Sequence, residues 1–162
     1  MQIAVISDSH DHVWKLDQAM PCLRQADLTI HCGDLCSPFV VRRLGEGIGG
    51  RPIHIVWGNN DGDKVMITHV AKDYPQIVLH GQMAVLDLEG VAVAANHYPE
   101  IARSLALSGQ YALVCYGHDH IAHEERMGSC LLLNPGEIMG LNGRSSLALV
   151  EVPAMSVRWI DL

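Results

Sequence analysis

The first sixty residues alternate between short apolar runs and segments of helical periodicity, and this alternation constrains the fold most strongly. The apolar runs cover residues 2–7, 27–30 and 52–57. Between them, residues 13–25 and 38–46 carry apolar side chains at helical spacing. Strand, helix, strand, helix and strand in this order predict a parallel sheet with right-handed crossovers.

The second half of the chain has shorter elements. After a helix predicted near residues 62–72, three short runs with glycine between them indicate antiparallel meander strands, at residues 76–79, 82–88 and 91–95. A helix over residues 99–108 then precedes five further predicted strands, at residues 111–116, 121–125, 130–133, 145–152 and 155–160. We expect the last four of these to complete a second sheet. The two sheets should pack face to face, with the helices outside.

Composition narrows the class of protein. The chain has 162 residues, of which 49% are hydrophobic and 18% are charged, as expected for one globular domain spanning residues 1–162. No apolar run approaches the roughly 20 residues of a membrane span. Met1 leads directly into the first apolar run without a basic leader. We therefore expect a cytoplasmic protein with no membrane partner.

Charge and cysteine content exclude further classes. The five cysteines are an odd number and form no Cys-x-x-Cys pair, which argues against a disulfide framework and a thiolate zinc site. The formal charge of −7 disfavours broad binding to nucleic acid. An acidic protein can still act on phosphate groups if metal ions supply positive charge locally.

Polar residues that could bind metal follow several of the predicted strands. Gly117-His118-Asp119-His120 follows residues 111–116, and alternation along a strand would place both histidines on one side. Together with the ends of the earlier strands, the candidate ligands are Asp8, His10, Asp34, Asn59, His97, His118 and His120. This mixture of oxygen and nitrogen donors suits Mn²⁺, Fe²⁺, Zn²⁺ or Ni²⁺ better than a calcium site or an all-thiolate zinc site.

The order of these motifs resembles the calcineurin-like metallophosphoesterase superfamily. The pattern is Asp-x-His at 8–10, Gly-Asp at 33–34, Gly-Asn-x-Asp at 58–61, a histidine at 97 and Gly-His-x-His at 117–120. It is most similar to the small, cap-less phosphodiesterases of bacteria and archaea. The resemblance implies an α/β fold, a four-layer αββα sandwich of two mixed sheets. It also implies a phosphodiesterase that hydrolyses small phosphate esters by metal-hydroxide attack on phosphorus.

The resemblance further implies a centre of two divalent metal ions, with Mn²⁺ as the first expectation and Fe, Zn or Ni as alternatives. Asp34 would bridge both ions. One ion would also be bound by Asp8, His10 and His120, and the other by Asn59, His97 and His118. Asp34, Asn59 and His97 are in addition the expected catalytic residues.

Three positions depart from the family pattern. Asn60 stands where many relatives have a histidine that protonates the leaving group, so we expect a preference for esters with acidic leaving groups, or a substitute acid such as His12 or His123. Tyr98 and Glu137 replace a usual glycine and a usual serine. Three other functions stay open: a phosphomonoesterase, a nucleotide hydrolase, and a non-catalytic protein-binding scaffold that resembles a retromer subunit. We also expect a homodimer.

Overall fold

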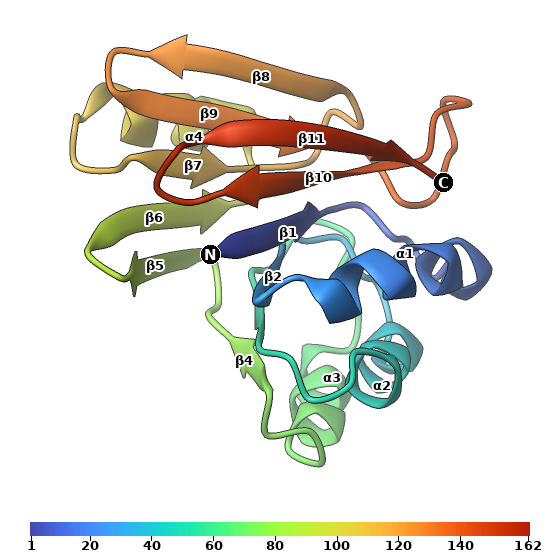
Figure 1. Cartoon of the computed structure of the whole chain (residues 1–162). Helices are drawn as coiled ribbons and strands as arrows, with labels where there is room; N and C mark the ends of the chain where they lie inside the picture. Colours follow the sequence, from blue (N-terminus) through green and yellow to red (C-terminus); the bar gives the residue numbers. More distant parts are fainter.

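The computed structural model describes residues 1–162, which form two mixed β-sheets flanked by helices (Figure 1). The first half contains β1 (Gln2–Ile6), α1 (Val13–Gln25), β2 (Leu28–His31), α2 (Pro38–Gly47), β3 (Ile53–Ile55), α3 (Lys64–Ala71) and β4 (Ile77–Leu79). The second half contains β5 (Met83–Leu88), β6 (Val91–Asn96), α4 (Pro99–Leu107), β7 (Leu113–Cys115), β8 (Ala122–Met127), β9 (Cys130–Pro135), β10 (Ser146–Glu151) and β11 (Ser156–Asp161). None of the four helices has the length and apolar character that crossing a membrane requires.

The first sheet has the order β11-β10-β1-β2-β3-β4, and the second has the order β5-β6-β7-β9-β8. Strands β1 to β4 run parallel, as the alternation of strands and helices predicts. β1 lies between β2 and β10, with Ile3 opposite Leu28 on one side and Val150 on the other. The first strand of the chain is therefore paired on both sides.

Two expectations about sheet membership are wrong. Residues 77–79 do not begin an antiparallel meander, because α3 carries the chain back so that β4 pairs parallel with β3. Only β5 and β6 form the expected antiparallel pair. β10 and β11 belong to the first sheet rather than the second. Residues 146–150 are buried on both faces, which suits an inner strand such as β10.

Three apolar clusters hold the layers together and confirm the expected sandwich. Alternation along β1 directs Ala4 and Ile6 toward the layer of α1, α2 and α3, while Ile3 and Val5 face the second sheet. A third cluster joins α4 to the outer face of the second sheet through Ala102, Ala106 and Val114. Helices therefore cover both outer faces, as four layers require.

The carboxyl ends of β1, β6 and β7 point to the same side of the molecule (Figure 1). Loops from both sheets meet at this edge. Ligands of open α/β sheets bind at such edges because the connecting loops converge there.

Candidate metal centre

Every predicted ligand lies in a loop or at a strand end on this common edge. Asp8 and His10 follow β1, Asp34 follows β2, and Asn59 follows β3. His97 directly follows β6, and the 118–120 loop follows β7.

Many of these residues adopt a left-handed backbone, with positive φ at Asp8, His10, Asp34, His118 and His120. This conformation costs about 1 kcal/mol for each residue that is not glycine. Strand alternation therefore does not place His118 and His120, because β7 ends at Cys115 and both histidines lie in a tightly turned loop. Their imidazoles instead belong to two adjacent groups of side chains.

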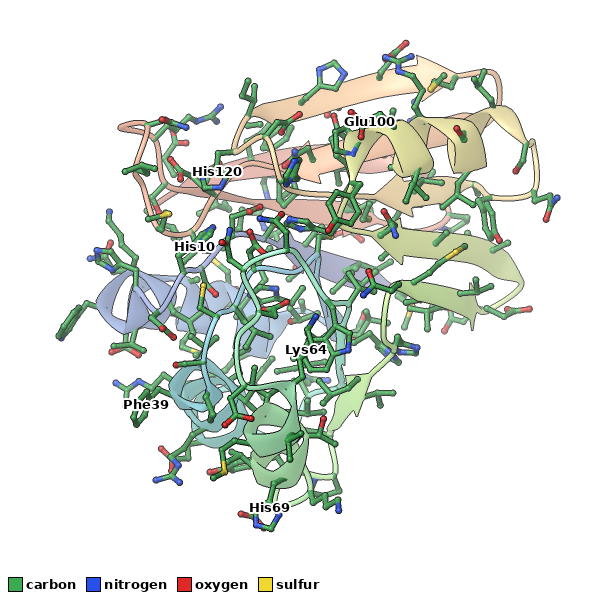
Figure 2. All side chains as sticks on the ribbon, turned by 180° about the vertical axis from the view of Figure 1, so that it is seen from behind. His10, Phe39, Lys64, His69, Glu100 and His120 are labelled. Carbon is green, nitrogen blue, oxygen red and sulfur yellow. The ribbon has the colours of Figure 1, made fainter.

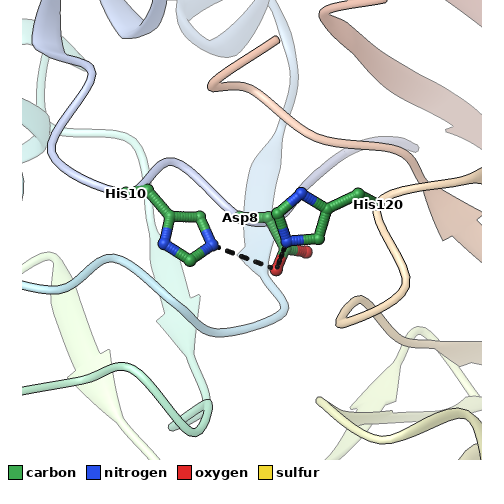
Figure 3. A group of neighbouring side chains, drawn as sticks. All are labelled: Asp8, His10 and His120. Carbon is green, nitrogen blue, oxygen red and sulfur yellow. Dashed lines mark ion pairs between the residues drawn. The ribbon is translucent and has the colours of Figure 1, made fainter. Parts of the chain in front are cut away.

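The first group joins Asp8, His10 and His120 (Figure 3). Nε2 of His10 lies 3.6 Å from Oδ1 of Asp8, and Nε2 of His120 lies 3.3 Å from the same oxygen. His10 and His120 lie next to each other although they come from opposite halves of the chain (Figure 2). Contact with the Asp8 carboxylate raises the pKa of His10.

The second group joins Asn59, His97 and His118. Oδ1 of Asn59 lies 3.0 Å from Nε2 of His97 and 2.8 Å from Nδ1 of His118. Nδ1 of His97 donates to the backbone oxygen of Cys32 at 2.8 Å. Burial alone would lower the pKa of His97, but the nearby Asp34 carboxylate outweighs burial and raises it.

Asp34 lies between the two groups. Its Oδ2 is 3.5 Å from Nε2 of His10 and 3.5 Å from Nε2 of His97. Burial alone would raise the pKa of Asp34, but contacts with His97 and Asn60 outweigh it and hold the pKa well below its usual range. A carboxylate in contact with both groups is what a shared ligand requires.

Asp61 holds the loops after β2 and β3 together. Its carboxylate accepts hydrogen bonds from the backbone nitrogens of Leu35 at 2.8 Å, Cys36 at 2.9 Å and Gly58 at 2.6 Å. Asp61 is nearly buried and takes no part in either ligand group. Its function is to fix the backbone that presents Asp34.

The donor atoms fit divalent cations. Oδ1 of Asp8 and Nε2 of His10 are buried without a hydrogen-bond partner. His97 donates its Nδ1 proton to a carbonyl, so in the neutral ring the Nε2 lone pair faces two further oxygens, from Asn59 and Asp34. Such acceptors repel one another unless a cation lies among them. The spacings of 3.3–3.6 Å are long for hydrogen bonds but close to the separation of two ligands that bind one ion at about 2.1 Å.

The two proposed substitute acids make other contacts. His12 caps α1, where its Nδ1 accepts a hydrogen bond from the backbone nitrogen of Lys15 at 3.2 Å. His123 lies on β8 and contacts Glu125 at 3.6 Å. Neither contacts a predicted ligand. Tyr98 lies beside the second group, where its ring packs edge-on against His97 and His118 with centroid distances of 5.2 Å.

Sequence reasoning did not predict the contacts that support the histidines, although Glu137 already stood out as a departure from the family pattern. Glu137 binds Nδ1 of His120 at 2.6 Å, and the thiol of Cys36 lies 3.4 Å from Nδ1 of His10. Behind them, the buried imidazole of His31 bonds Ser9 at 3.0 Å. The acid in the Asn-Pro-Gly-Glu segment at 134–137 was a usable signal, since a charge beside a buried strand needs a partner. No sequence signal marked Cys36.

An αββα sandwich with these donors at the carboxyl edge of its sheets defines a metal-dependent phosphoesterase. The sequence matches the calcineurin-like phosphoesterase superfamily domain over residues 1–155. The chain belongs to this superfamily, which confirms the resemblance drawn from its motifs. Members of the family use divalent metal ions.

Individual relatives support the assignment. The chain is 28% identical to phosphodiesterase MJ0936 of Methanocaldococcus jannaschii, in an alignment covering 100% of this chain and 99% of the relative. It is 30% identical to the probable metallophosphoesterase YsnB of Bacillus subtilis, covering 99% and 91%. The solved structure of an archaeal phosphodiesterase matches with a TM-score of 0.92 at 27% identity and full coverage of both chains. Zinc-bound Vps29 of Entamoeba histolytica shares the fold alone, with a TM-score of 0.67 at 17% identity and coverage of 100% and 98%.

Proposed function

We propose that this protein is a metal-dependent phosphodiesterase that hydrolyses small phosphate esters. The observation that carries the proposal is the position of Asp34, with one oxygen 3.5 Å from an imidazole nitrogen of each ligand group. One cation would be held by Asp8, His10, Asp34 and His120, and a second by Asp34, Asn59, His97 and His118. The full-length similarity to a protein named phosphodiesterase supports the same class of substrate.

Bound divalent cations would supply the charge that neutralises phosphate oxygens and make water a nucleophile at neutral pH. The protein itself supplies no such charge, because no lysine or arginine takes part in the hydrogen bonds or ion pairs of either group. Its own side chains provide carboxylates, a carboxamide and imidazoles. The carboxylates among them repel a phosphate unless cations are present.

The site has no evident general acid to protonate the leaving group. The carboxamide of Asn60 donates to Oδ2 of Asp34 at 2.8 Å, and its backbone nitrogen donates to Oδ1 at 2.7 Å. Asn60 therefore orients Asp34 and cannot act as a general acid. We propose that the preferred substrates are diesters with acidic leaving groups, such as aryl diesters. Such leaving groups depart without the general acid catalysis that typically contributes about 10²–10⁴-fold to the rate.

The test is hydrolysis of an aryl phosphodiester and its matched monoester by metal-stripped protein, with and without added Mn²⁺. Asp34→Asn is the control, since an amide cannot supply two anionic oxygens to a shared site. We expect diester turnover that needs Mn²⁺ and falls at least 10²-fold in Asp34→Asn. Faster monoester turnover would favour a phosphomonoesterase. No turnover with any divalent metal would favour a protein-binding scaffold.

Finer features of the function form part of this proposal. We propose Mn²⁺ as the native metal and two ions per chain, to be counted by elemental analysis of purified protein. The cytoplasm is the proposed location, supported by five free cysteines, which suit a reducing compartment.

We further propose a single domain and a homodimer without nucleic-acid or membrane partners. Sedimentation of the purified protein tests the homodimer.

A further inference from the structure

Glu137 is a charged side chain with no exposure to solvent, in the loop that follows β9. Its Oε2 lies 2.6 Å from Nδ1 of His120, and its Oε1 accepts a hydrogen bond from the backbone nitrogen of Asn142 at 2.6 Å. The only side-chain partner of this carboxylate is the imidazole of His120. Burial of an unpaired carboxylate is costly, so Glu137 requires the imidazole as its partner.

This contact fixes the tautomer of His120. A carboxylate can only accept, so the hydrogen lies on Nδ1 and is donated to Glu137. The Nε2 atom of the neutral ring then keeps its lone pair, which faces Oδ1 of Asp8 at 3.3 Å. Glu137 therefore prepares the nitrogen that a cation would use.

The loop that carries Glu137 is tied to the segment after β1 that carries Asp8. The backbone nitrogens of Ile138 and Met139 donate to the backbone oxygens of Ser7 and Asp8, at 3.0 and 3.1 Å. The hydroxyl of Ser145 closes the loop by donating to the backbone oxygen of Ile138 at 2.6 Å. The position of Glu137 is thus set by the backbone of Ser7 and Asp8, directly after β1, as well as by His120.

The supporting partners of the other imidazoles are not carboxylates. Nδ1 of His97 donates to the backbone oxygen of Cys32, and Nδ1 of His10 lies against the thiol of Cys36. Nδ1 of His118 lies 2.8 Å from the carboxamide oxygen of Asn59. Of the four imidazoles, only His120 has a carboxylate as the partner of its Nδ1. A carboxylate behind an imidazole raises the basicity of the nitrogen that binds metal, and loss of such a partner typically weakens metal binding 10–100-fold.

We propose that Glu137 is a positioning residue that makes the Asp8, His10 and His120 position the tighter of the two metal positions, and the first to fill. The inference rests on the metal centre of the proposed function. It adds the order in which the two metal positions fill and names the residue that sets this order.

The test is a titration of metal-free protein with Mn²⁺ alone. Binding is monitored by calorimetry and by the electron paramagnetic resonance signal of free Mn²⁺. Wild-type protein should bind in a tighter and a weaker step. Glu137→Gln keeps the shape but removes the charge, and its amide can donate to Nδ1 and move the ring hydrogen to Nε2. We expect the tighter step to weaken about 10–100-fold while the weaker step keeps its affinity.

Two variants make the result specific. Glu124→Gln removes one negative charge from an exposed position on β8 and should leave both steps unchanged. Glu137→Asp keeps the charge and should retain more affinity than Glu137→Gln. It also serves as the reporter if Glu137→Gln fails to fold. Nitrogen-15 shifts of His120 in metal-free protein should show the hydrogen on Nδ1 in wild type and on Nε2 in Glu137→Gln.

The outcomes separate the inference from the function. If wild-type protein binds no Mn²⁺, the metal centre of the proposed function is wrong. If wild type binds in two steps and Glu137→Gln binds identically, only the role of Glu137 is wrong. Equal weakening by Glu137→Asp and Glu137→Gln would also overturn it, because shape rather than charge would then set the affinity.

Discussion

In the proposed reaction, Asn60 would determine how much acid catalysis the leaving group receives. Its carboxamide is bound to Asp34 at 2.8 Å, so the side chain already lies beside the reacting edge of the site. A histidine at this position can donate a proton, whereas an amide cannot. In the proposed reaction, the residue would therefore link the geometry of Asp34 to substrate preference.

We predict that Asn60→His raises kcat for an alkyl phosphodiester at least tenfold and changes kcat for an aryl phosphodiester little, because only the poor leaving group needs the acid. The measurement is kcat for both esters with Mn²⁺ present. Asn60→Ala is the control for loss of the contact with Asp34. Equal effects on the two esters would show that the missing acid does not limit the reaction.

His31 should make stability depend on pH. Burial lowers its pKa from 6.5 to about 4, and both ring nitrogens already have partners, Ser9 and the backbone nitrogen of Gly33. Below pH 6.5 this histidine binds a proton in the unfolded chain but not in the folded chain. The free energy of unfolding therefore falls as the pH falls from 6.5 toward 4. The loss reaches at most about 3 kcal/mol.

Urea unfolding at several pH values in the presence of a chelator measures this loss. We predict a smaller decline with falling pH in His31→Gln, whose side chain does not titrate, than in wild type. Parallel curves for the two proteins would show that His31 does not carry the effect.

At the scale of elements, the site depends on close contact between neighbouring loops. A Cβ on Gly58 would overlap Oδ1 of Asp34 and lie 2.6 Å from the Asp34 backbone nitrogen. We predict that Gly58→Ala displaces Asp34 and weakens Mn²⁺ binding at both positions at least tenfold. Calorimetric titration of the metal-free variant tests this. Gly90→Ala is the control for backbone strain without overlap, since Gly90 has a φ of +84° and no atom lies near a Cβ there.

Asp61 joins the same two loops by hydrogen bonds to backbone nitrogens rather than by packing. We predict that Asp61→Asn lowers the free energy of unfolding by about 2 kcal/mol, because one oxygen that accepts hydrogen bonds becomes a donor in a buried place. Chemical unfolding without metal measures the change. Unchanged stability would mean that the loops keep their form without this carboxylate.

The elements themselves were largely predictable, but their partners were not. Periodicity predicts helices α1 and α2 and the first strands. Polar residues at strand ends identify the candidate ligands, which the structure brings to one edge. The pairing of β10 with β1 and of β4 with β3 depends on contacts distant in sequence, about which a local apolar pattern says nothing. The contact between Glu137 and His120 was not predicted for the same reason, because a tight loop after β7 turns the imidazole toward a separate loop.

At the scale of the whole molecule, the site collects buried carboxylates and imidazoles whose charges are not fully compensated within the protein. We predict that Mn²⁺ at a hundredfold excess over Kd stabilises the folded protein by about 2.7 kcal/mol relative to chelated protein. For a chain of this size, this free energy raises Tm by roughly 5–10 °C. Thermal unfolding with Mn²⁺ and with a chelator tests this. Asp34→Asn should lose most of the shift, and the absence of a shift in wild type would contradict the metal centre.

The distribution of the donors along the chain also has a consequence during synthesis. Asp8, His10, Asp34 and Asn59 belong to the first half, whereas His97, His118 and His120 belong to the second, and Asp8 and His118 are 110 positions apart. A ribosome adding about 5–20 residues per second separates them by roughly 5–20 s. For that time the nascent chain offers mainly oxygen donors, which suit Mg²⁺, and the imidazoles that favour transition metals arrive last. The full set of candidate donors is therefore available only once His120, the last of them, has been synthesised.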